Sequence, residues 1–194
     1  MEKGRIVKIG FIGSAGGGKS IVALDLSKHL NVPFLRSKDI TRPILKRYGY
    51  VYSADNCVEV FLSKKSIEFE IVDQRIYEEN LLQCGFVTDR TNIESFCYAF
   101  LNLSSYNPSD LELLENLCKE SIIKYDKLFY FPWNGGWLED NGVRTLNSYL
   151  QRHIDMMIRG IIIDWNLQSK VVFIPVDTMV SQKTLSFIEE KLNI

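Results

Sequence analysis

Residues 10–20 read GFIGSAGGGKS, in which five glycines, a lysine and two serines stand within one short stretch after an apolar run. Glycine loses more conformational entropy on folding than any other residue, so a cluster of glycines is favoured only where the backbone turns sharply or lies against a ligand. Residues 13–20 match the pattern G-x-x-x-x-G-K-[ST] at every position. The stretch therefore predicts a binding loop near the start of the chain.

The segments on either side of this loop support that interpretation. Residues 5–13 form a β-rich run, and residues 19–30 carry apolar side chains at roughly helical spacing. A loop between a strand and a helix is the context that this pattern requires, which disfavours an ordinary glycine-rich turn. Successive N–H groups of such a loop form an anion nest, and the positive end of the helix adds to the attraction.

We therefore predict a P-loop that binds a nucleoside triphosphate, with ATP and Mg²⁺ as cofactors. Lys19 would reach the outer phosphates, and the Ser20 hydroxyl would ligate Mg²⁺. The residues predicted to bind the nucleotide are Gly13, Ser14, Ala15, Gly16, Gly17, Gly18, Lys19, Ser20 and Ile21.

The bulk composition predicts one globular domain over residues 1–194, since 46% of the residues are hydrophobic and 24% are charged. The formal net charge is −1, so no global basic field is present to hold a nucleic-acid backbone. Nucleic acid is therefore a disfavoured partner, although a local basic patch stays open. The oligomeric state is open as well, between a monomer and a homodimer.

The cysteines and the N-terminus point to the cytoplasm. Cys57, Cys84, Cys97 and Cys118 include no C-x-x-C pair, which predicts buried reduced thiols rather than a zinc site or a disulfide framework. Residues 1–12 are too short and too charged for a signal peptide, and no apolar run is long enough to span a bilayer. We expect no membrane partner.

Predicted strands and helices alternate along the chain, which implies a parallel sheet covered on both faces. The expected fold is therefore a three-layer α/β P-loop NTPase fold with about five strands, flanking helices and a lid loop at 133–145. Further strands are expected at 32–37, 84–90, 127–132 and 170–176, and further helices at 39–48, 58–83, 93–103, 109–124, 146–165 and 178–192.

Asp89 and Arg90 end the predicted strand GFVTDR. Ligands of such sheets bind at the carboxyl ends of the strands, so this pair is expected to open beside the P-loop. Asp89 would hold Mg²⁺ through its water shell, and Arg90 would bind an acceptor or the transferring phosphoryl group. A solvated, salt-bridged strand end is the less favoured alternative.

The stretch KDITRP places Asp39 and Arg42 after the second predicted strand, with Pro43 near the first turn of the helix that follows. Asp39 could accept the proton of an attacking hydroxyl, and Arg42 could bind a phosphate or ribose. An acidic helix start followed by a surface arginine is an equally good interpretation.

The predicted lid loop contains Arg144 in the stretch DNGVRT, and Arg152 follows on the next helix. A mobile loop with an arginine suits closure over the phosphates, where it would stabilise transferred charge. A solvated loop is the alternative for Arg144, and it is the favoured one for Arg152. Trp133 and Trp137 are expected to anchor the loop on the core rather than to stack on a base.

Taken together, these stretches resemble small P-loop kinase-like ATPases, typified by the ribosylnicotinamide kinase domain of the bacterial NAD-synthesis regulator and often described as AAA-type. The resemblance covers IGFIGSAGGGKS, DITR, VTDRTNIESFCYA, YDKLFYFP and DNGVRT, in that order. Nucleoside and nucleoside-monophosphate kinases are similar as well. Asp39 departs from the pattern, because a glutamate is more usual at that position. The resemblance implies phosphoryl transfer to a nucleoside-type hydroxyl or phosphate.

The leading functional hypothesis is thus an ATP-dependent kinase of a nucleoside or nucleotide. Lys19 would bind the phosphates, Mg²⁺ would sit between Ser20 and Asp89, and Asp39 would act as the base, with Arg90 and Arg144 stabilising charge. One alternative is a phage-type kinase that acts on modified DNA bases or ends. The other is an ATPase or switch that acts through protein partners.

Overall fold

The computed structural model describes residues 7–50, 65–135, 147–178 and 181–194 of the chain. One five-stranded sheet lies at its centre, with the strand order β2-β3-β1-β4-β5 and every pairing parallel. The strands are β1 (Lys8–Ile12), β2 (Phe34–Leu35), β3 (Phe86–Thr88), β4 (Lys127–Tyr130) and β5 (Val171–Phe173). The predicted parallel sheet of about five strands is therefore confirmed.

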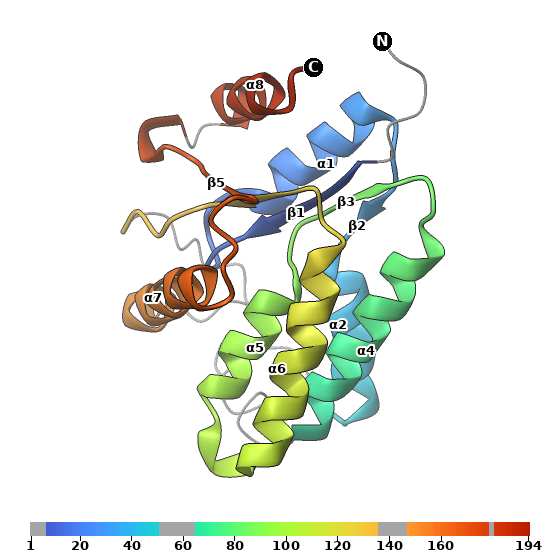
Figure 1. Ribbon diagram of the computed structural model, residues 1–194, viewed down its shortest axis with the longest axis vertical. Coiled ribbons are helices and arrows are strands. Elements are labelled where there is room, and N and C mark those ends of the chain that lie inside the picture. Colours follow the sequence, from blue (N-terminus) through green and yellow to red (C-terminus); the bar gives the residue numbers. More distant parts are fainter. Residues whose placement is uncertain (1–6, 51–64, 136–146, 179–180) are drawn as a thin grey trace.

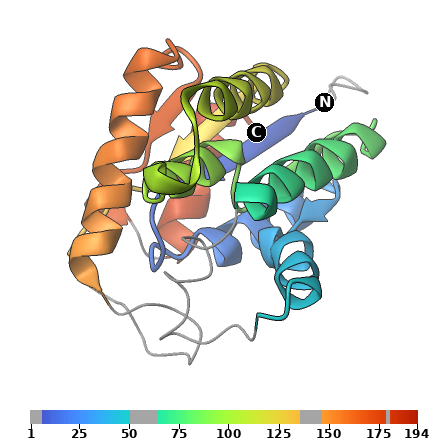
Figure 2. The same cartoon turned by 90° about the horizontal axis from the view of Figure 1, so that it is seen from below.

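Helices cover both faces of the sheet, which makes three layers (Figure 1). They are α1 (Lys19–Leu30), α2 (Ser37–Arg47), α4 (Lys65–Leu81), α5 (Asn92–Phe100), α6 (Pro108–Ile123), α7 (Ser148–Asp164) and α8 (Ser181–Leu192). Helices α1 and α8 lie on one face and the others on the opposite face. Seen from below, that second layer runs from α7 through α6 and α5 to α4 and α2 (Figure 2).

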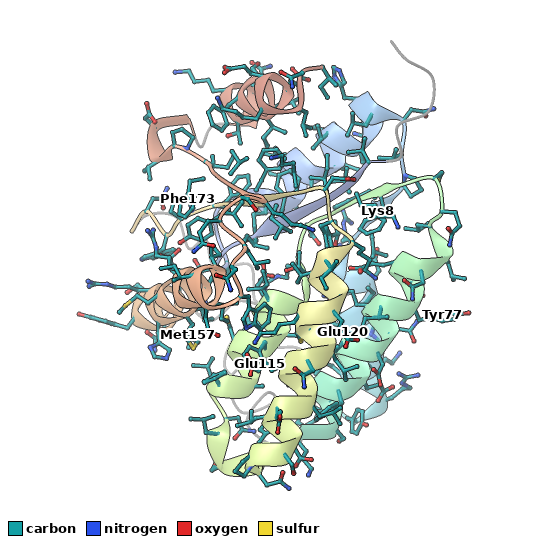
Figure 3. All side chains as sticks on the ribbon, in the orientation of Figure 1. Lys8, Tyr77, Glu115, Glu120, Met157 and Phe173 are labelled. Atoms are coloured by element: carbon teal, nitrogen blue, oxygen red, sulfur yellow. The ribbon has the colours of Figure 1, made fainter. Side chains whose placement is uncertain are left out.

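The strands are mostly apolar, apart from Lys8, Thr88 and Lys127 at strand ends, because helices cover both faces of the sheet. On β1, Ile9 and Phe11 pack with α1 and α8, whereas Ile12 faces α4–α7. On β4, Phe129 and Tyr130 divide between the same two cores. Figure 3 shows side chains filling the space between the sheet and its helices on either face. This arrangement explains why these strands read as continuous hydrophobic runs instead of alternating ones.

The register of β1 brings the ends of two strands together. Gly10 of β1 pairs with Thr88 of β3 and with Leu128 of β4. A Cβ at Gly10 would lie 2.7 Å from Cγ2 of Thr91, so only glycine fits beneath the start of α5. Because β1 and β3 are adjacent and parallel, the loop after Ile12 emerges beside the residues that follow Thr88.

Helix α2 begins earlier than the sequence suggested. It starts at Ser37, so Pro43 lies inside the helix and not near its first turn as predicted. The backbone N–H of Ser37 donates to Oδ1 of Asp89 at 2.7 Å, which satisfies a helix-start donor that local sequence leaves without a partner. Ile40 and Ile44 then pack against α4 in a third apolar cluster.

Several other predicted boundaries also shift. Helix α6 begins at Pro108, and Oδ1 of Asn107 accepts from the Asp110 N–H at 2.8 Å, so Asn107 and not Ser109 opens the helix. The predicted helix 58–83 is described only from Lys65, because residues 58–64 lie outside the described part.

The prediction of buried thiols is confirmed for two of the cysteines and is wrong for a third. Cys97 and Cys118 are buried free thiols, but Cys84 is exposed because it lies in the turn before β3; Cys57 lies outside the described residues. Among the described helices, none is both long enough and apolar enough to cross a membrane.

Candidate functional site

The loop between β1 and α1 has the backbone shape that its glycines allow. Gly13, Gly16 and Gly18 all have positive φ angles, of 139°, 92° and 76°. At Gly13 a Cβ would lie 2.3 Å from the carbonyl oxygen of Phe131, which follows β4. Gly18 has open space around it, so its glycine serves the backbone conformation alone.

The loop delivers its donors to the start of α1. Gly18 occupies the N-cap position, and no side chain caps the helix. First-turn N–H groups without a capping side chain, together with the helix dipole, favour a bound anion. Lys19 is only 6% exposed, and its Nζ donates to the carbonyl of Ser14 across the loop. A buried positive charge is thereby held within the loop itself.

Asp89 joins the loop to the neighbouring strand. The Ser20 hydroxyl donates to Oδ2 of Asp89, and the Ser37 N–H holds Oδ1. A hydroxyl and a carboxylate oxygen in contact are the hard ligands that Mg²⁺ prefers. The described residues contain no group of three or more His, Cys, Asp or Glu side chains suited to a metal. The pair Ser20 and Asp89 thus fits Mg²⁺, which usually takes its other ligands from phosphate and water.

Arg90 stands next to Asp89 but points along α5. Its Nη1 donates to the hydroxyl of Tyr98 at 3.2 Å. Its backbone carbonyl accepts from Thr88 Oγ1 and from Arg75 Nη1, both at 2.8 Å. The structure therefore brings the backbone of Arg90 beside the loop, with a partly exposed guanidinium on the side of α5.

Arg75 is a residue of this site that the sequence reasoning missed. It lies on α4 and is 1% exposed, and besides the Arg90 carbonyl it donates to Oγ of Ser37 at 2.9 Å. One side chain thus ties the end of β3 to the start of α2. A planar guanidinium with several donors suits such bridging. No sequence motif indicated it, because the partners lie far apart along the chain.

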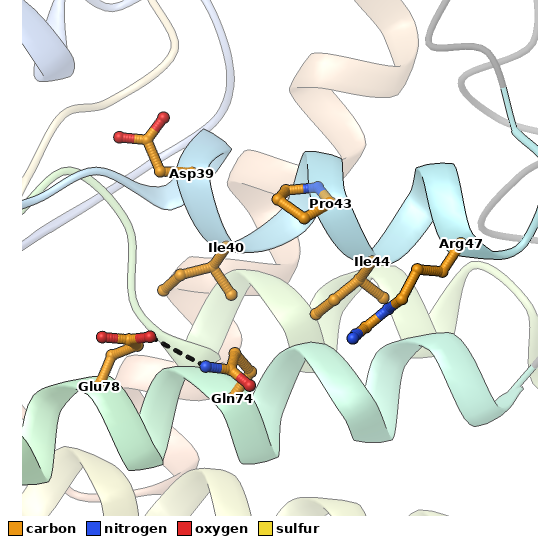
Figure 4. A pocket seen from close by; sticks show the side chains of 7 residues that line it. All are labelled: Asp39, Ile40, Pro43, Ile44, Arg47, Gln74 and Glu78. Atoms are coloured by element: carbon orange, nitrogen blue, oxygen red, sulfur yellow. Dashed lines mark hydrogen bonds between the residues drawn. The ribbon is translucent and has the colours of Figure 1, made fainter.

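Asp39 and Arg42 lie on the exposed side of α2. Figure 4 shows Asp39 near the start of the helix, its carboxylate directed away from Ile40 and from α4. A pocket of about 190 Å³ lies between α2 and α4; it is lined by Asp39, Ile40, Pro43, Ile44, Arg47, Gln74 and Glu78. Asp39 is exposed on the first turn of α2, two residues after the buried Ser37, whose backbone N–H donates to Asp89.

Only some of the residues of the predicted lid and of the helix after it lie in the described part of the chain. Arg144 and Trp137 lie in 136–146, outside the described residues. Arg152 is exposed on α7, whereas its neighbour Gln151 is only 3% exposed. Oε1 of Gln151 accepts from the N–H of Ala15 at 2.8 Å, which joins α7 to the loop. Sequence reasoning considered Arg152 and missed Gln151, which carries no charge and belongs to no motif.

Glu94 is another missed residue, although its signal is visible in the sequence. Its Oε2 accepts from the N–H of Thr91 at 3.0 Å, and its Oε1 accepts from the N–H of Gly13 at 3.2 Å. The Thr91 hydroxyl in turn accepts from Ile93 N–H, which completes a capping box. The spacing T-x-x-E predicts this cap, but not its second contact with the P-loop.

A further buried carboxylate lies away from the loop. Glu68 of α4 is 1% exposed, and neither of its oxygens has a hydrogen-bond partner among the described residues. Burial raises the pKa of Glu68 from 4.5 to about 8, against the opposing effect of Arg75. The hydroxyl of Tyr106 is also buried with no partner in the described part of the chain, and burial beside Glu68 raises the pKa of Tyr106.

No family model and no curated protein sequence matches the chain. Solved structures do resemble it. NadR in complex with NR is similar over 97% of this chain and 52% of its own, at 16% identity and a TM-score of 0.73. Deoxyadenosine kinase from M. mycoides with the products dCMP and dCDP is similar over 96% and 99%, at 13% identity and a TM-score of 0.67.

A third similar structure is YorR from Bacillus subtilis in complex with phosphorylated GDP. It matches 96% of both chains, at 17% identity and a TM-score of 0.54. The chain spans about half the length of NadR and nearly the whole of the other two. The chain therefore has the fold of the P-loop nucleoside and nucleotide kinases, which confirms the resemblance that its motifs indicated.

Proposed function

We propose that the protein is a Mg²⁺-dependent kinase that transfers the terminal phosphoryl group of ATP to a nucleoside or nucleotide. The observation that carries the proposal is the contact between Ser20 and Asp89 at the mouth of a glycine loop. It joins a P-loop to an acidic strand end, which are the two parts that hold a nucleotide and its metal in P-loop enzymes. The similar structures include a deoxyadenosine kinase, and this supports the acceptor class.

In this mechanism the chain positions the phosphates and stabilises their charge. Loop amides other than those of Gly13 and Ala15, which donate to Glu94 and Gln151, would bind the phosphate chain together with the ammonium of Lys19. Ser20 and Asp89 would hold a Mg²⁺ ion, which would supply positive charge to the phosphates. Arg90, whose Nη1 donates to Tyr98 in this structure, is the proposed contact to the transferring phosphoryl group.

On the acceptor side, Asp39 is the proposed base and Arg42 the proposed contact to a phosphate or ribose. Both are exposed on α2, whose first turn is fixed against Asp89 through Ser37. A carboxylate within hydrogen-bond reach of an attacking hydroxyl can take its proton during transfer. Arg144 keeps its predicted role as a charge stabiliser that closes over the phosphates.

The test is a transfer assay with γ-labelled ATP, Mg²⁺ and a panel of nucleosides and nucleoside monophosphates. We expect label on one acceptor class, and we expect Asp39→Asn to abolish transfer but leave ATP binding unchanged. Label that passes only to water would overturn the kinase proposal in favour of an ATPase. Label on duplex or single-stranded DNA, but on no small acceptor, would favour the DNA-directed alternative.

A matched lysine pair on α1 checks the nucleotide half of the proposal. Lys19→Met should reduce transfer by about a thousandfold, because it removes the buried cation that faces the phosphates. Lys28→Met changes an exposed lysine on the same helix and should leave transfer within twofold. Equal effects of the two substitutions would contradict the assigned role of Lys19.

A further inference from the structure

Gln151 makes an unusual contact for a residue so far along the chain. It lies on the first turn of α7 and is 3% exposed, and its side chain accepts a hydrogen bond from the Ala15 N–H at 2.8 Å. The orientation of its carboxamide is fixed by this partner. A backbone N–H can only donate, so the atom that faces Ala15 must be the oxygen.

The other end of the same carboxamide is a pair of donors. Carbonyl and amide bond lengths of 1.23 and 1.33 Å place Nε2 within about 5 Å of the Ala15 nitrogen. Nε2 makes no hydrogen bond with the described residues, yet it is not among the side-chain atoms sealed from solvent without a partner. Two N–H donors thus remain available beside the glycine loop.

The chemistry of the loop decides what these donors would meet. Its backbone amides and the ammonium of Lys19 supply donors and positive charge, which suit the acceptor oxygens of a phosphate chain. A neutral carboxamide can accept from the loop through one end and donate to a phosphate through the other. A carboxylate could keep only the first of these two contacts.

We propose that Gln151 is a phosphate-binding residue whose Nε2 donates to a phosphate oxygen of the bound nucleotide. This inference rests on the proposed function. Helix α7 then forms one wall of the phosphate site, opposite the start of α1. The competing explanation is that Gln151 only anchors α7 on the loop through Oε1. The two explanations differ in how affinity responds to the charge placed at position 151.

The experiment is a charge series at this position, measured as the Kd for MgATP by calorimetry. Gln151→Glu retains an acceptor for Ala15 but puts a negative charge near the phosphates, and we expect at least about tenfold weaker binding. Gln151→Met loses the hydrogen bonds without adding charge, and we expect about fivefold weaker binding. Gln151→Lys supplies a cationic donor and should bind at least as tightly as the wild type.

His153→Met, an exposed neighbour on α7, is the matched control and should leave the Kd unchanged. A residue that is only an anchor gives the opposite order, with Glu close to wild type and both Met and Lys weaker. That order would overturn the inference, and the Met–Lys comparison decides the matter even if Gln151→Glu fails to fold. A wild type that fails to bind MgATP would overturn both proposals.

The two proposals fail in different ways when the wild type does bind MgATP. If it binds but phosphorylates no acceptor, the kinase proposal falls and the charge series still decides the role of Gln151. If it phosphorylates an acceptor and the charge series is flat, the inference about Gln151 alone is wrong.

Discussion

Asp89 and Glu68 are both carboxylates with almost no exposed surface, yet their surroundings are opposite. At the end of β3, Asp89 has both oxygens engaged, one by the Ser37 N–H and the other by the Ser20 hydroxyl. Within the helical layer, neither oxygen of Glu68 is engaged by a described residue, and burial raises its pKa to about 8. Burial is common to the two, so the difference lies in the hydrogen-bond donors that surround each carboxylate.

The comparison shows where this fold can keep a charge. Donors converge where parallel strands end and helices begin, because the first N–H groups of a helix have no partner within it. Glu68 also lies in a first turn, that of α4 as described from Lys65, yet no donor among the described residues reaches its carboxylate. A charge useful for chemistry is therefore expected at the strand ends, and a proton is expected to stay on Glu68 at neutral pH.

The largest effect is expected when the charge of Asp89 is removed. In Asp89→Asn an oxygen can still accept from Ser37, but the amide nitrogen cannot accept from Ser20 or ligate Mg²⁺. We expect kcat to fall by about 10²–10³ with little loss of stability. Steady-state kinetics at several Mg²⁺ concentrations check this, with exposed Asp25→Asn as the control. A fall of less than fivefold would show that Asp89 needs no charge.

The next effect concerns Glu94, which like Asp89 is buried and fully bonded. Glu94→Ala leaves the N–H groups of Gly13 and Thr91 without their acceptors, which should cost about 2–3 kcal/mol of unfolding free energy. Glu94→Gln retains one acceptor and should cost about 1 kcal/mol. Urea denaturation distinguishes the two. If both variants lose the same amount, the contact with Gly13 contributes nothing to stability.

A smaller, pH-dependent effect is expected for Glu68. The folded pKa of about 8 exceeds the unfolded value near 4.5, so the folded state binds the extra proton between these pH values. Stability from this group is complete below pH 4.5 and is lost as the pH rises through 8, by at most about 1.4 kcal/mol per pH unit.

Glu68→Gln should remove that slope. We expect the variant to be close to the wild type near pH 5 and to exceed its stability increasingly as the pH rises to 8, within the limit that this slope sets. Denaturation curves at pH 5, 6.5 and 8 measure the difference. A difference that stays constant across this range would mean that Glu68 does not titrate with folding.

The smallest change in stability is expected at Asn107, an uncharged side chain that also accepts a hydrogen bond at the start of a helix. Asn107 caps α6 by accepting from the N–H of Asp110, at an exposed end of the helical layer. Asn107→Ala should cost about 1 kcal/mol, by an equal amount at pH 5 and pH 8, because the amide does not titrate. Thermal unfolding at the two pH values provides the measurement. A cost that depends on pH would undermine the assignment of the slope to Glu68.

The fold followed from signals that are local in the sequence. The glycine loop between a strand and a helix, and the alternation of apolar runs with helical patterns, were enough to predict the parallel sheet and its layers. Asp89 was predicted beside the loop because strand ends of parallel sheets share one edge, and its contact with Ser20 confirms that placement.

Residues that act over long sequence separations were missed for a physical reason. Gln151 and Arg75 form their contacts, and Glu94 its contact with Gly13, only once distant segments pack together, so no local pattern records these partners. The start of α2 was misplaced in the same way, since the acceptor for Ser37 belongs to another strand. Local propensity decides which elements form, whereas tertiary contacts decide where they begin and what their buried polar groups bind.

The loop proposed to bind the nucleotide lies within the first 20 residues, but it contacts partners 81 and 136 positions downstream. Forming such long-range contacts requires most of the chain to have collapsed first. In a refolding experiment, nucleotide affinity should consequently emerge with the last kinetic phase, after far-ultraviolet ellipticity has recovered. Binding of a fluorescent nucleotide would thus act as a built-in signal that the chain has finished folding.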